Sequence, residues 1–498
     1  MKTSYNPNIF REYDIRGIAD KELPDELSRD LGQHLAQDFR RVASARKEKR
    51  ERPLVSVGRD CRLSSPRLAT AMIDGLTSAG IDVLDLGVCP TPLSYFSVFH
   101  FDLDGSVMIT GSHNPAEFNG FKTCVGKETI HGAAIQELRK RLETSAELGT
   151  GHNTSGTSDT SGIRGTVRPS EVIAPYIDYV VANITPRVAD FPRKKKIKVV
   201  LDAGNGTAST VAPELFRRLG ADVVPLYCEL DGRFPNHHPD PTVLKNLEAA
   251  IQAVQKEKAD FGVAFDGDSD RIGAIDETGR PLFGDELMVV FSRAVLAEKP
   301  GAAIISEVKS SHRLYQDIAE NGGKPIMWKT GHSLIKAKLK ESNAALAGEM
   351  SGHVFFADRY FGYDDALYSA ARLFEIVSRS KDPLSIHIAD LVPVVATPEI
   401  RLDCSDDLKF KIVESTKELL AKERKVNDID GVRVDYGYGW GLVRASNTQP
   451  VLVLRFEAED ERRMAEIQNE FYTALNRAAL GLGYTRFSRE PTEAAVTH

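Results

Sequence analysis

The sequence lacks several features that would assign it to a class at once. Its five cysteines are widely spaced and no two form a CxxC pair, so neither a zinc knuckle nor a disulfide framework is indicated. No stretch approaches the roughly 18 apolar residues of a membrane span, and the first residues hold no apolar core of signal-peptide length. These absences predict a cytoplasmic protein with reduced thiols and no membrane partner.

An excess of positive charge is also missing. The 498 residues include 64 Lys and Arg against 71 Asp and Glu, a net charge of −7. General nucleic-acid binders are usually basic, so we expect no nucleic-acid partner. Local basic loops still allow small anions to bind. Domains usually hold about 100–200 residues, so a chain of this length predicts more than one hydrophobic core.

A strand–helix–strand pattern occurs three times, over residues 54–87, 198–227 and 302–331. In each copy a glycine follows the helix just before the second strand: Gly80, Gly220 and Gly322. Glycine is the common residue after a helix C-terminus. Units of this kind build parallel or mixed α/β sheets. After residue 393 the pattern changes to short strands and two helices, near 410–424 and 462–480, which predicts a small α+β domain.

These patterns divide the chain into four expected domains. Their predicted ranges are 1–165, 166–280, 281–393 and 394–498. The first boundary falls at the end of a stretch rich in Ser, Thr and Gly, residues 144–166, which predicts a flexible linker. The tail beyond Phe487 is expected to extend past the last domain.

The first loop of chemical interest, Thr110–Pro115, reads TGSHNP and follows the apolar run SVMIT. A serine in such a turn is well presented, and we take Ser112 as the candidate nucleophile. Backbone N–H groups of the turn, with His113 and Asn114, are suited to surround phosphate oxygens. Serine is a weak nucleophile without a metal or a base. Taken alone, the loop is equally compatible with an ordinary capped turn.

The second loop places three carboxylates, Asp266, Asp268 and Asp270, at alternate positions. So much like charge is costly unless a cation is bound. Oxygen ligands favour Mg²⁺, Ca²⁺ or Mn²⁺ over zinc. An EF-hand is a competing interpretation because Glu277 stands at its twelfth position. However, Arg271 occupies the position that needs glycine, and the flanks are strand-like, which argues against it. Arg271 is instead suited to pair with a phosphate.

Two further loops offer ligands for a phosphorylated sugar. The side chains of Glu349, Ser351 and His353 suit sugar hydroxyls. The loop that begins at Arg444 suits a phosphate, through Arg444, Ser446, Asn447 and Thr448. Either loop alone also fits a polar hairpin turn. Lys309 and His332 follow strand-like runs, where a single Lys or His is more often structural.

Taken together, the loops resemble those of the α-D-phosphohexomutase family. The motifs are FREYDIRG, TGSHNP, DGDSDR, GEMSGH and RASNTQP, and they follow the family's order over nearly the whole chain. The resemblance is greatest to the bacterial phosphomannomutase/phosphoglucomutase branch. GEMSGH is the form of the sugar loop associated with both mannose and glucose phosphates, whereas phosphoglucosamine mutases typically have Gln in place of Met350.

This resemblance implies a fold and a set of roles. Three similar mixed α/β domains and a C-terminal α+β domain, similar to the TATA-binding protein, would surround a central cleft. Ser112 would carry a phosphoryl group and, with Asp266, Asp268 and Asp270, hold one Mg²⁺. The sugar would meet Glu349, Ser351 and His353, and its second phosphate would meet Arg444, Ser446, Asn447 and Thr448. Further residues would line the cleft: Tyr13, Arg16, Lys122, Arg271, Lys309 and His332.

The implied reaction is the reversible interconversion of hexose 1-phosphate and hexose 6-phosphate through a hexose 1,6-bisphosphate. Lys122, Arg16 and His353 are candidates for the general acid and base, and Lys122 is preferred because it lies close to Ser112 in the sequence. We expect a phosphosugar partner and a monomer or homodimer. The alternatives are a phosphoglucosamine mutase and a catalytically silent phosphosugar-binding protein.

Overall fold

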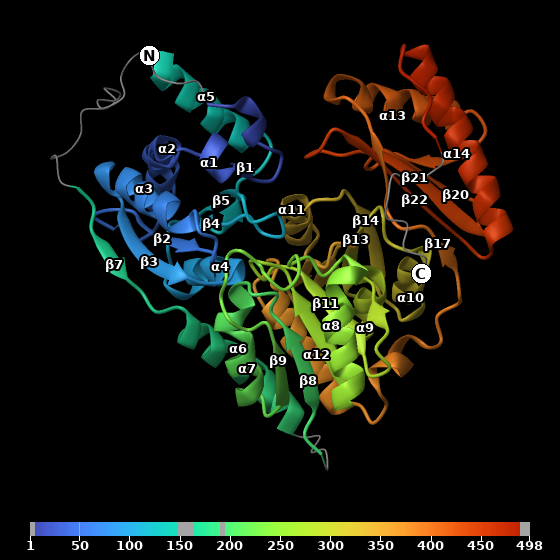
Figure 1. Ribbon diagram of the computed structural model, residues 1–498, viewed down its shortest axis with the longest axis horizontal. Coiled ribbons are helices and arrows are strands. Elements are labelled where there is room, and N and C mark those ends of the chain that lie inside the picture. The colour runs from blue at the N-terminus through green and yellow to red at the C-terminus, as the bar shows by residue number, and fades with distance from the viewer. Residues whose placement is uncertain (1–4, 49, 148–163, 190–194, 489–498) are drawn as a thin grey trace. The chain divides into compact units, whose positions relative to one another are not determined.

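A computed structural model describes residues 5–48, 50–147, 164–189 and 195–488 (Figure 1). The chain forms two compact units. The first comprises residues 1–283 and 351–385, and the second comprises residues 284–350 and 386–498. Residues 148–163 of the predicted linker, and the tail from residue 489, lie outside the described residues. Within the described ranges, no helix is long and apolar enough to cross a membrane.

The first sheet of the first unit has the order β1-β5-β4-β2-β3-β7, with β6 paired to β5. Its strands are β1 (Ile15–Ile18), β2 (Leu54–Arg59), β3 (Asp82–Val88), β4 (Gly105–Ile109), β5 (Phe118–Val125), β6 (Glu128–Thr129) and β7 (Val167–Pro169). The four strands β4, β2, β3 and β7 are parallel, whereas β5 is antiparallel to both β4 and β1. The strand β7 extends this sheet to Pro169, four residues beyond the predicted boundary at 165.

The helices of this region are α1 (Ala19–Glu22), α2 (Asp25–Ser44), α3 (Ser65–Ser78), α4 (Thr91–His100) and α5 (Ala133–Glu147). The helices α2 and α3 pack against each other (Figure 1). Leu27, Leu31 and Leu35 recur at every fourth position of α2 and are fully buried, as expected for the apolar stripe of a surface helix. They join the core that also contains Val55 and Val57 of β2.

The second sheet of the first unit has the order β12-β11-β10-β8-β9. It comprises β8 (Lys198–Asp202), β9 (Asp222–Leu226), β10 (Phe261–Phe265), β11 (Ile272–Asp276) and β12 (Pro281–Leu282). The strands β9, β8 and β10 are parallel, and β11 is antiparallel to its neighbours. Around it lie α6 (Ile173–Ala189), α7 (Ala212–Arg218), α8 (Leu244–Glu257), the short strand β16 (Val354–Phe356) and α12 (Ala366–Arg379).

The second unit contains a parallel region and an antiparallel sheet. In the former, β13 (Ala303–Glu307) pairs in parallel with β14 (Lys324–Trp328) and β15 (Leu346–Gly348), accompanied by α9 (Gly284–Glu298), α10 (His312–Glu320) and α11 (His332–Ser342). The latter has the order β17-β22-β21-β20-β19, with β18 on β22. Its elements are β17 (Val395–Ala396), β18 (Ile400–Asp403), α13 (Asp406–Leu420), β19 (Val426–Asn427), β20 (Val432–Asp435), β21 (Gly439–Ala445), β22 (Val451–Ala458) and α14 (Glu461–Gly481).

The fold class predicted from the sequence is confirmed. Each of the three repeated segments forms a strand, a helix and a parallel strand: β2-α3-β3, β8-α7-β9 and β13-α10-β14. The three glycines have positive φ angles, 76° at Gly80, 90° at Gly220 and 75° at Gly322. Side chains with a Cβ rarely adopt this conformation, so the glycines end the helices as predicted.

Candidate active site

The strand registers of the first sheet bring four separate segments to one edge. Parallel pairing of β2 and β4 sets Arg59 opposite Ile109, so the loops that follow these strands leave the sheet together. Antiparallel pairing sets Lys122 of β5 opposite Met108 and Arg16 of β1 opposite Gly120. The Ser112 loop therefore begins beside Lys122 and also beside Arg16, which stands far earlier in the sequence.

Ser112 is buried and has a φ of 51°, in the left-handed region. Its N–H donates to Thr110 Oγ1 at 2.8 Å, and its Oγ donates to Asp266 Oδ2 at 2.9 Å. The imidazole Nδ1 of His113 lies 3.2 Å from the same Oγ. Burial, followed by the positive charges of Arg271 and Arg16, holds the pKa of His113 well below its usual value. The serine hydroxyl thus lies between a neutral imidazole and a carboxylate.

The three carboxylates follow β10 and are fully buried. Asp266 Oδ1 accepts the backbone N–H groups of Asp270 and Arg271 at 3.0 and 3.1 Å, which turns the loop back on itself. Asp266, Asp268 and Asp270 each present an oxygen within 4.8 Å of the others, the arrangement that a metal ion requires. The sequence prediction that these side chains converge is confirmed.

Lys122 supplies positive charge to this cluster. Its Nζ donates to Asp268 Oδ2 at 2.8 Å and also to Asp270 Oδ2. Burial works against the charge of Lys122, but the two carboxylates outweigh it and raise its pKa. Burial likewise acts to raise the pKa of Asp270, yet Lys122 and His353 hold it well below the usual value. Burial, followed by the charges of Asp268 and Asp270, raises the pKa of Asp266.

The donor set fits a divalent cation. Lys122 bonds to two of the three buried carboxylates, Asp268 and Asp270. Asp268 Oδ1 is buried without a hydrogen-bond partner. Burying such an oxygen is costly unless it binds something else, such as a cation. All the oxygens are hard donors of the kind that Mg²⁺ and Mn²⁺ prefer.

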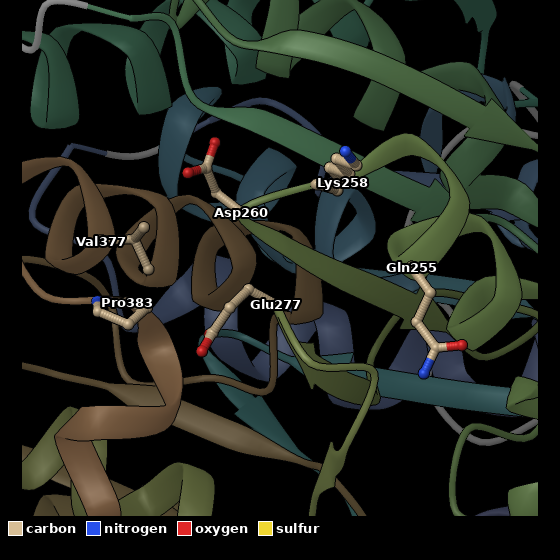
Figure 2. A pocket seen from close by; sticks show the side chains of 7 residues that line it. Gln255, Lys258, Asp260, Glu277, Val377 and Pro383 are labelled. Carbon is tan, nitrogen blue, oxygen red and sulfur yellow. The ribbon is translucent and has the colours of Figure 1, made fainter.

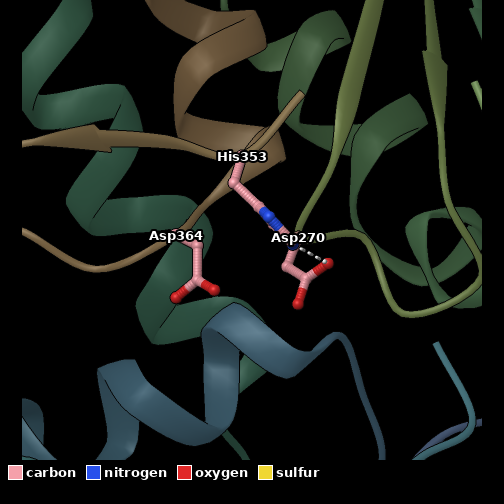
Figure 3. A group of neighbouring side chains, drawn as sticks. All are labelled: Asp270, His353 and Asp364. Carbon is pink, nitrogen blue, oxygen red and sulfur yellow. Dashed lines mark ion pairs between the residues drawn. The ribbon is translucent and has the colours of Figure 1, made fainter. Parts of the chain in front are cut away.

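Arg271 and His353 border the cluster. Arg271 Nε approaches His353 Nε2 at 3.4 Å, and the same imidazole nitrogen lies 3.3 Å from Asp270 Oδ1. Ser351 Oγ lies 3.1 Å from His353 Nδ1. Figure 3 shows the imidazole directed at Asp270, with Asp364 beside them. These three residues form a second group whose ligand atoms are near enough for a metal ion, and it shares Asp270 with the first.

Arg16 holds the Ser112 loop from the side of β1. Its guanidinium donates to the carbonyl of Gly111 at 3.2 Å and to Asn114 Oδ1 at 2.5 Å, and it pairs with Asp14. Tyr13 is half-buried and precedes β1. The first unit therefore gathers Ser112, its metal candidates, Lys122, Arg16, His113, Arg271, Ser351 and His353.

The second unit holds the other predicted residues. Glu349 Oε1 accepts the N–H of Gly331, at the start of the helix that His332 begins, at 2.6 Å. Lys309 Nζ donates to Glu399 at 2.9 Å and lies 3.6 Å from Glu307. Burial opposes the charge on Lys309, but these carboxylates raise its pKa. Glu307 also accepts the hydroxyl of Thr330, next to Gly331, and so links Lys309 to the segment that Glu349 contacts.

The predicted phosphate loop is linked to the same segment. Arg444 Nε and the N–H of Thr330 both donate to Asp430 Oδ2 at 3.0 Å. Ser446 Oγ accepts the N–H of Thr448 at 3.3 Å, while Asn447 is half-buried at the tip. Arg444 is buried, and the Asp430 carboxylate orients its guanidinium in the absence of a ligand.

A pocket elsewhere in the first unit includes none of these residues. It is lined by Gln255, Lys258, Ala259, Asp260, Glu277, Val377 and Pro383 (Figure 2). Asp260 precedes β10 whereas Asp266 follows it, so the strand's length of roughly 17 Å separates the two places. Asp260 and Glu277 accept backbone N–H groups of Lys198 and Ser385 at 2.7 and 3.2 Å. The two carboxylates of this pocket therefore have a structural role.

Sequence reasoning missed several residues that organise these sites. In the first unit they are Asp60, Arg62 and Thr91, whose Oγ1 donates to Asp268 Oδ2 at 2.6 Å. In the second they are Glu307, which accepts the N–H of Met350 at 2.8 Å, and Asp430. A signal was present, because Asp60 and Arg62 closely follow a buried parallel strand and Glu307 ends one.

Family comparisons match four successive segments of the chain. The descriptions are phosphoglucomutase/phosphomannomutase alpha/beta/alpha domain I over residues 7–148, domain II over 174–279, domain III over 283–395, and the C-terminal domain over 399–474. These matches confirm the resemblance inferred from the five loop motifs.

Individual relatives agree. A phosphomannomutase/phosphoglucomutase of Pseudomonas putida is 44% identical over 94% of this chain and 96% of its own. A phosphoglucomutase of Neisseria gonorrhoeae is 40% identical, with coverage of 94% and 96%. The crystal structure of a phosphoglucomutase/phosphomannomutase family protein from Burkholderia thailandensis is similar with a TM-score of 0.84 at 39% identity, covering 95% of this chain and 98% of that one.

Proposed function

Because this chain belongs to the phosphoglucomutase/phosphomannomutase family, we propose that it is an isomerase that interconverts hexose 1-phosphates and hexose 6-phosphates by way of a phosphoserine at Ser112. The sugar is mannose or glucose. One observation carries the assignment of the serine: its Oγ bonds to Asp266 at 2.9 Å, within a cluster of three buried carboxylates. A phosphoryl group on that oxygen would stand beside any cation the carboxylates hold.

The exchange proceeds in two balanced steps. The bond between phosphorus and Ser112 Oγ breaks as a bond forms from phosphorus to the free hydroxyl oxygen of the hexose monophosphate. The proton of that hydroxyl is transferred through the enzyme to Ser112 Oγ, leaving a hexose 1,6-bisphosphate and a free serine. The bisphosphate then reorients. The bond from its other phosphorus to the sugar oxygen breaks as a bond forms from that phosphorus to Ser112 Oγ, and the serine proton is transferred to the sugar oxygen. Positioning and charge neutralisation are the main demands of such a transfer.

Asp266, Asp268 and Asp270, with an oxygen on Ser112, would hold one Mg²⁺, which supplies charge neutralisation at the transferring phosphate. Asp268 and Asp270 raise the pKa of Lys122, so we assign its ammonium to charge neutralisation at the transferring phosphate. A raised pKa makes it a weak proton donor. His113 has a lowered pKa, and its Nδ1 lies 3.2 Å from Ser112 Oγ, so we assign its neutral imidazole to relaying a proton at that atom when Asp266 is bound to the metal. Arg16 and Arg271 add positive charge nearby.

Substrate recognition is assigned residue by residue, as the family membership implies. Glu349, Ser351 and His353 would bind sugar hydroxyls, while Lys309, His332 and Tyr13 would contact the sugar from other loops. Arg444, Ser446, Asn447 and Thr448 would hold the phosphate that is not being transferred. The buried guanidinium of Arg444, oriented by Asp430, suits a phosphate, because charge-assisted hydrogen bonds are the strongest available.

Intact-mass analysis tests the proposal. The purified protein, incubated with glucose 1,6-bisphosphate and Mg²⁺, should gain about 80 Da on Ser112, the mass of one phosphoryl group. A coupled assay should show turnover of mannose 1-phosphate and glucose 1-phosphate, and Ser112→Ala should remove turnover without lowering the melting temperature. Failure of the wild type to acquire phosphate would refute the phosphoenzyme and favour a silent binding protein. Preference for glucosamine 1-phosphate would favour the phosphoglucosamine alternative.

A further inference from the structure

Arg62 is a buried arginine directly behind the Ser112 loop. It follows β2, and its side chain is 0% exposed. Its guanidinium donates to four backbone carbonyls of the segment between β4 and β5, those of Ser112 at 2.7 Å, Asn114 at 2.5 Å, Phe118 at 3.0 Å and Pro115. The fifth donor, Nε, bonds to Asp60 Oδ2 at 3.1 Å. Every N–H of the side chain is therefore used, and four of the five bonds hold one loop.

Asp60 holds the other side of the same serine. Its Oδ2 accepts the N–H of Gly111 at 3.0 Å, in addition to the bond from Arg62. The peptide group that precedes Gly111 is thus anchored through its N–H, and the peptide group that follows Ser112 is anchored through the Ser112 carbonyl. Between these anchors the φ of Ser112 is 51°, a conformation that residues with a Cβ adopt rarely. These anchors fix the direction in which Ser112 projects its Oγ.

Gly111 is needed for this arrangement. A Cβ on Gly111 would stand 2.5 Å from both Arg62 Cζ and Arg62 Nε. The glycine of TGSHNP therefore admits the guanidinium under the loop. Without that cation four carbonyl groups would converge in a place that water does not reach, so the loop would have to open.

We propose that Arg62 is the positioning residue of the phosphoserine, holding Ser112 Oγ toward the carboxylate cluster through the loop carbonyls. The inference rests on the proposed function. Arg62 touches the backbone and not the reacting atoms, so it acts through Ser112. Misplacement of a reacting group by about 1 Å lowers rates by about 100-fold. The residues assigned to sugar and phosphate recognition make no bond to Arg62 among those described, so its loss affects kcat and leaves KM nearly unchanged.

The test compares Arg62→Lys and Arg62→Met with Arg67→Met. Arg67, in α3, is a matched control because it too bonds to carbonyls, those of Ala19 and Leu23, but contacts nothing in the Ser112 loop. For each protein, kcat and KM for glucose 1-phosphate, phosphate content by intact mass and the melting temperature are measured. We expect kcat of Arg62→Lys to fall about 100-fold with KM within about 3-fold, Arg62→Met to fall further, and Arg67→Met to match wild type.

A folded Arg62→Lys with wild-type kcat, measured against an active wild type, would overturn the inference and leave the proposed function intact. A parallel rise in KM would also overturn it. An inactive, unphosphorylated wild type would instead refute the proposed function itself. If neither Arg62 variant folds, Asp60→Asn decides: it keeps the guanidinium but weakens its anchor, so kcat should fall at constant KM, and unchanged kcat would refute the positioning role.

Discussion

Replacing Lys122 by methionine should reveal how the carboxylate cluster is stabilised without a metal. The ammonium is buried and bonds to two fully buried carboxylates. Removing one partner of a buried ion pair costs about 3–5 kcal/mol, because the other charge is left uncompensated. For a unit of about 300 residues each kcal/mol lowers the melting temperature by about 1–2 °C, so Lys122→Met in EDTA should melt roughly 3–10 °C below wild type.

Mg²⁺ should restore much of this loss. A cation present at 100 times its dissociation constant stabilises the native state by about 2.7 kcal/mol. The gain should be larger in the variant than in wild type, where the ammonium already occupies two of the carboxylates. The assay is differential scanning calorimetry near neutral pH, where Lys122, with its raised pKa, and Asp270, with its lowered one, are both fully ionised.

Lys198→Met is the control, because that lysine is partly exposed and lies 3.8 and 3.9 Å from Asp222 and Glu257. Exposed pairs contribute about 0–1 kcal/mol, so its melting temperature should stay within about 2 °C of wild type. If Lys122→Met in EDTA melts with the control, the buried ion pair does not stabilise the cluster and the reasoning is wrong.

Two further perturbations test other regions. The buried carboxyl of Asp365 accepts bonds from Tyr176 and Tyr360, and burial raises its pKa to about 6. A carboxyl whose pKa is raised in the folded state stabilises the fold at pH values below its unfolded pKa. Roughly 3 kcal/mol of stability should therefore be lost as the pH rises from below 4 to above 6. Urea titrations should show a smaller loss in Asp365→Asn, and identical pH profiles for the two proteins would contradict the prediction. Arg444→Lys should raise KM for glucose 1-phosphate about 10- to 100-fold at nearly constant kcat, since a forked donor is lost; a pure kcat effect in steady-state assays would exclude the phosphate role.

Local signals predicted much of the fold. Gly80, Gly220 and Gly322 end helices because backbone geometry at those points favours glycine whatever the tertiary context. The triad was predictable for a similar reason, since Asp266, Asp268 and Asp270 lie in one short loop. Lys122 was chosen for its closeness to Ser112 in the sequence, and the structure adds that β4–β5 pairing carries it to the carboxylates.

The missed residues depend on pairing across long stretches of chain. Arg62 lies 50 residues before Ser112, and they meet because β2 and β4 are adjacent and parallel. Asp430 and Thr330 are 100 residues apart and meet through one hydrogen bond. No local periodicity reports such contacts. The central cleft, the domain boundaries and the individual roles of the site residues stay predictions.

The left-handed backbone at Ser112 limits which hydroxyl residue this position accepts. Threonine offers the same oxygen, but a β-branched side chain is a genuine outlier at a φ of 51°. Asparagine and aspartate tolerate that conformation more readily and have no hydroxyl to phosphorylate. Serine is thus selected by backbone shape as well as by chemistry, so an exchange for threonine, conservative by its functional group, is not conservative here.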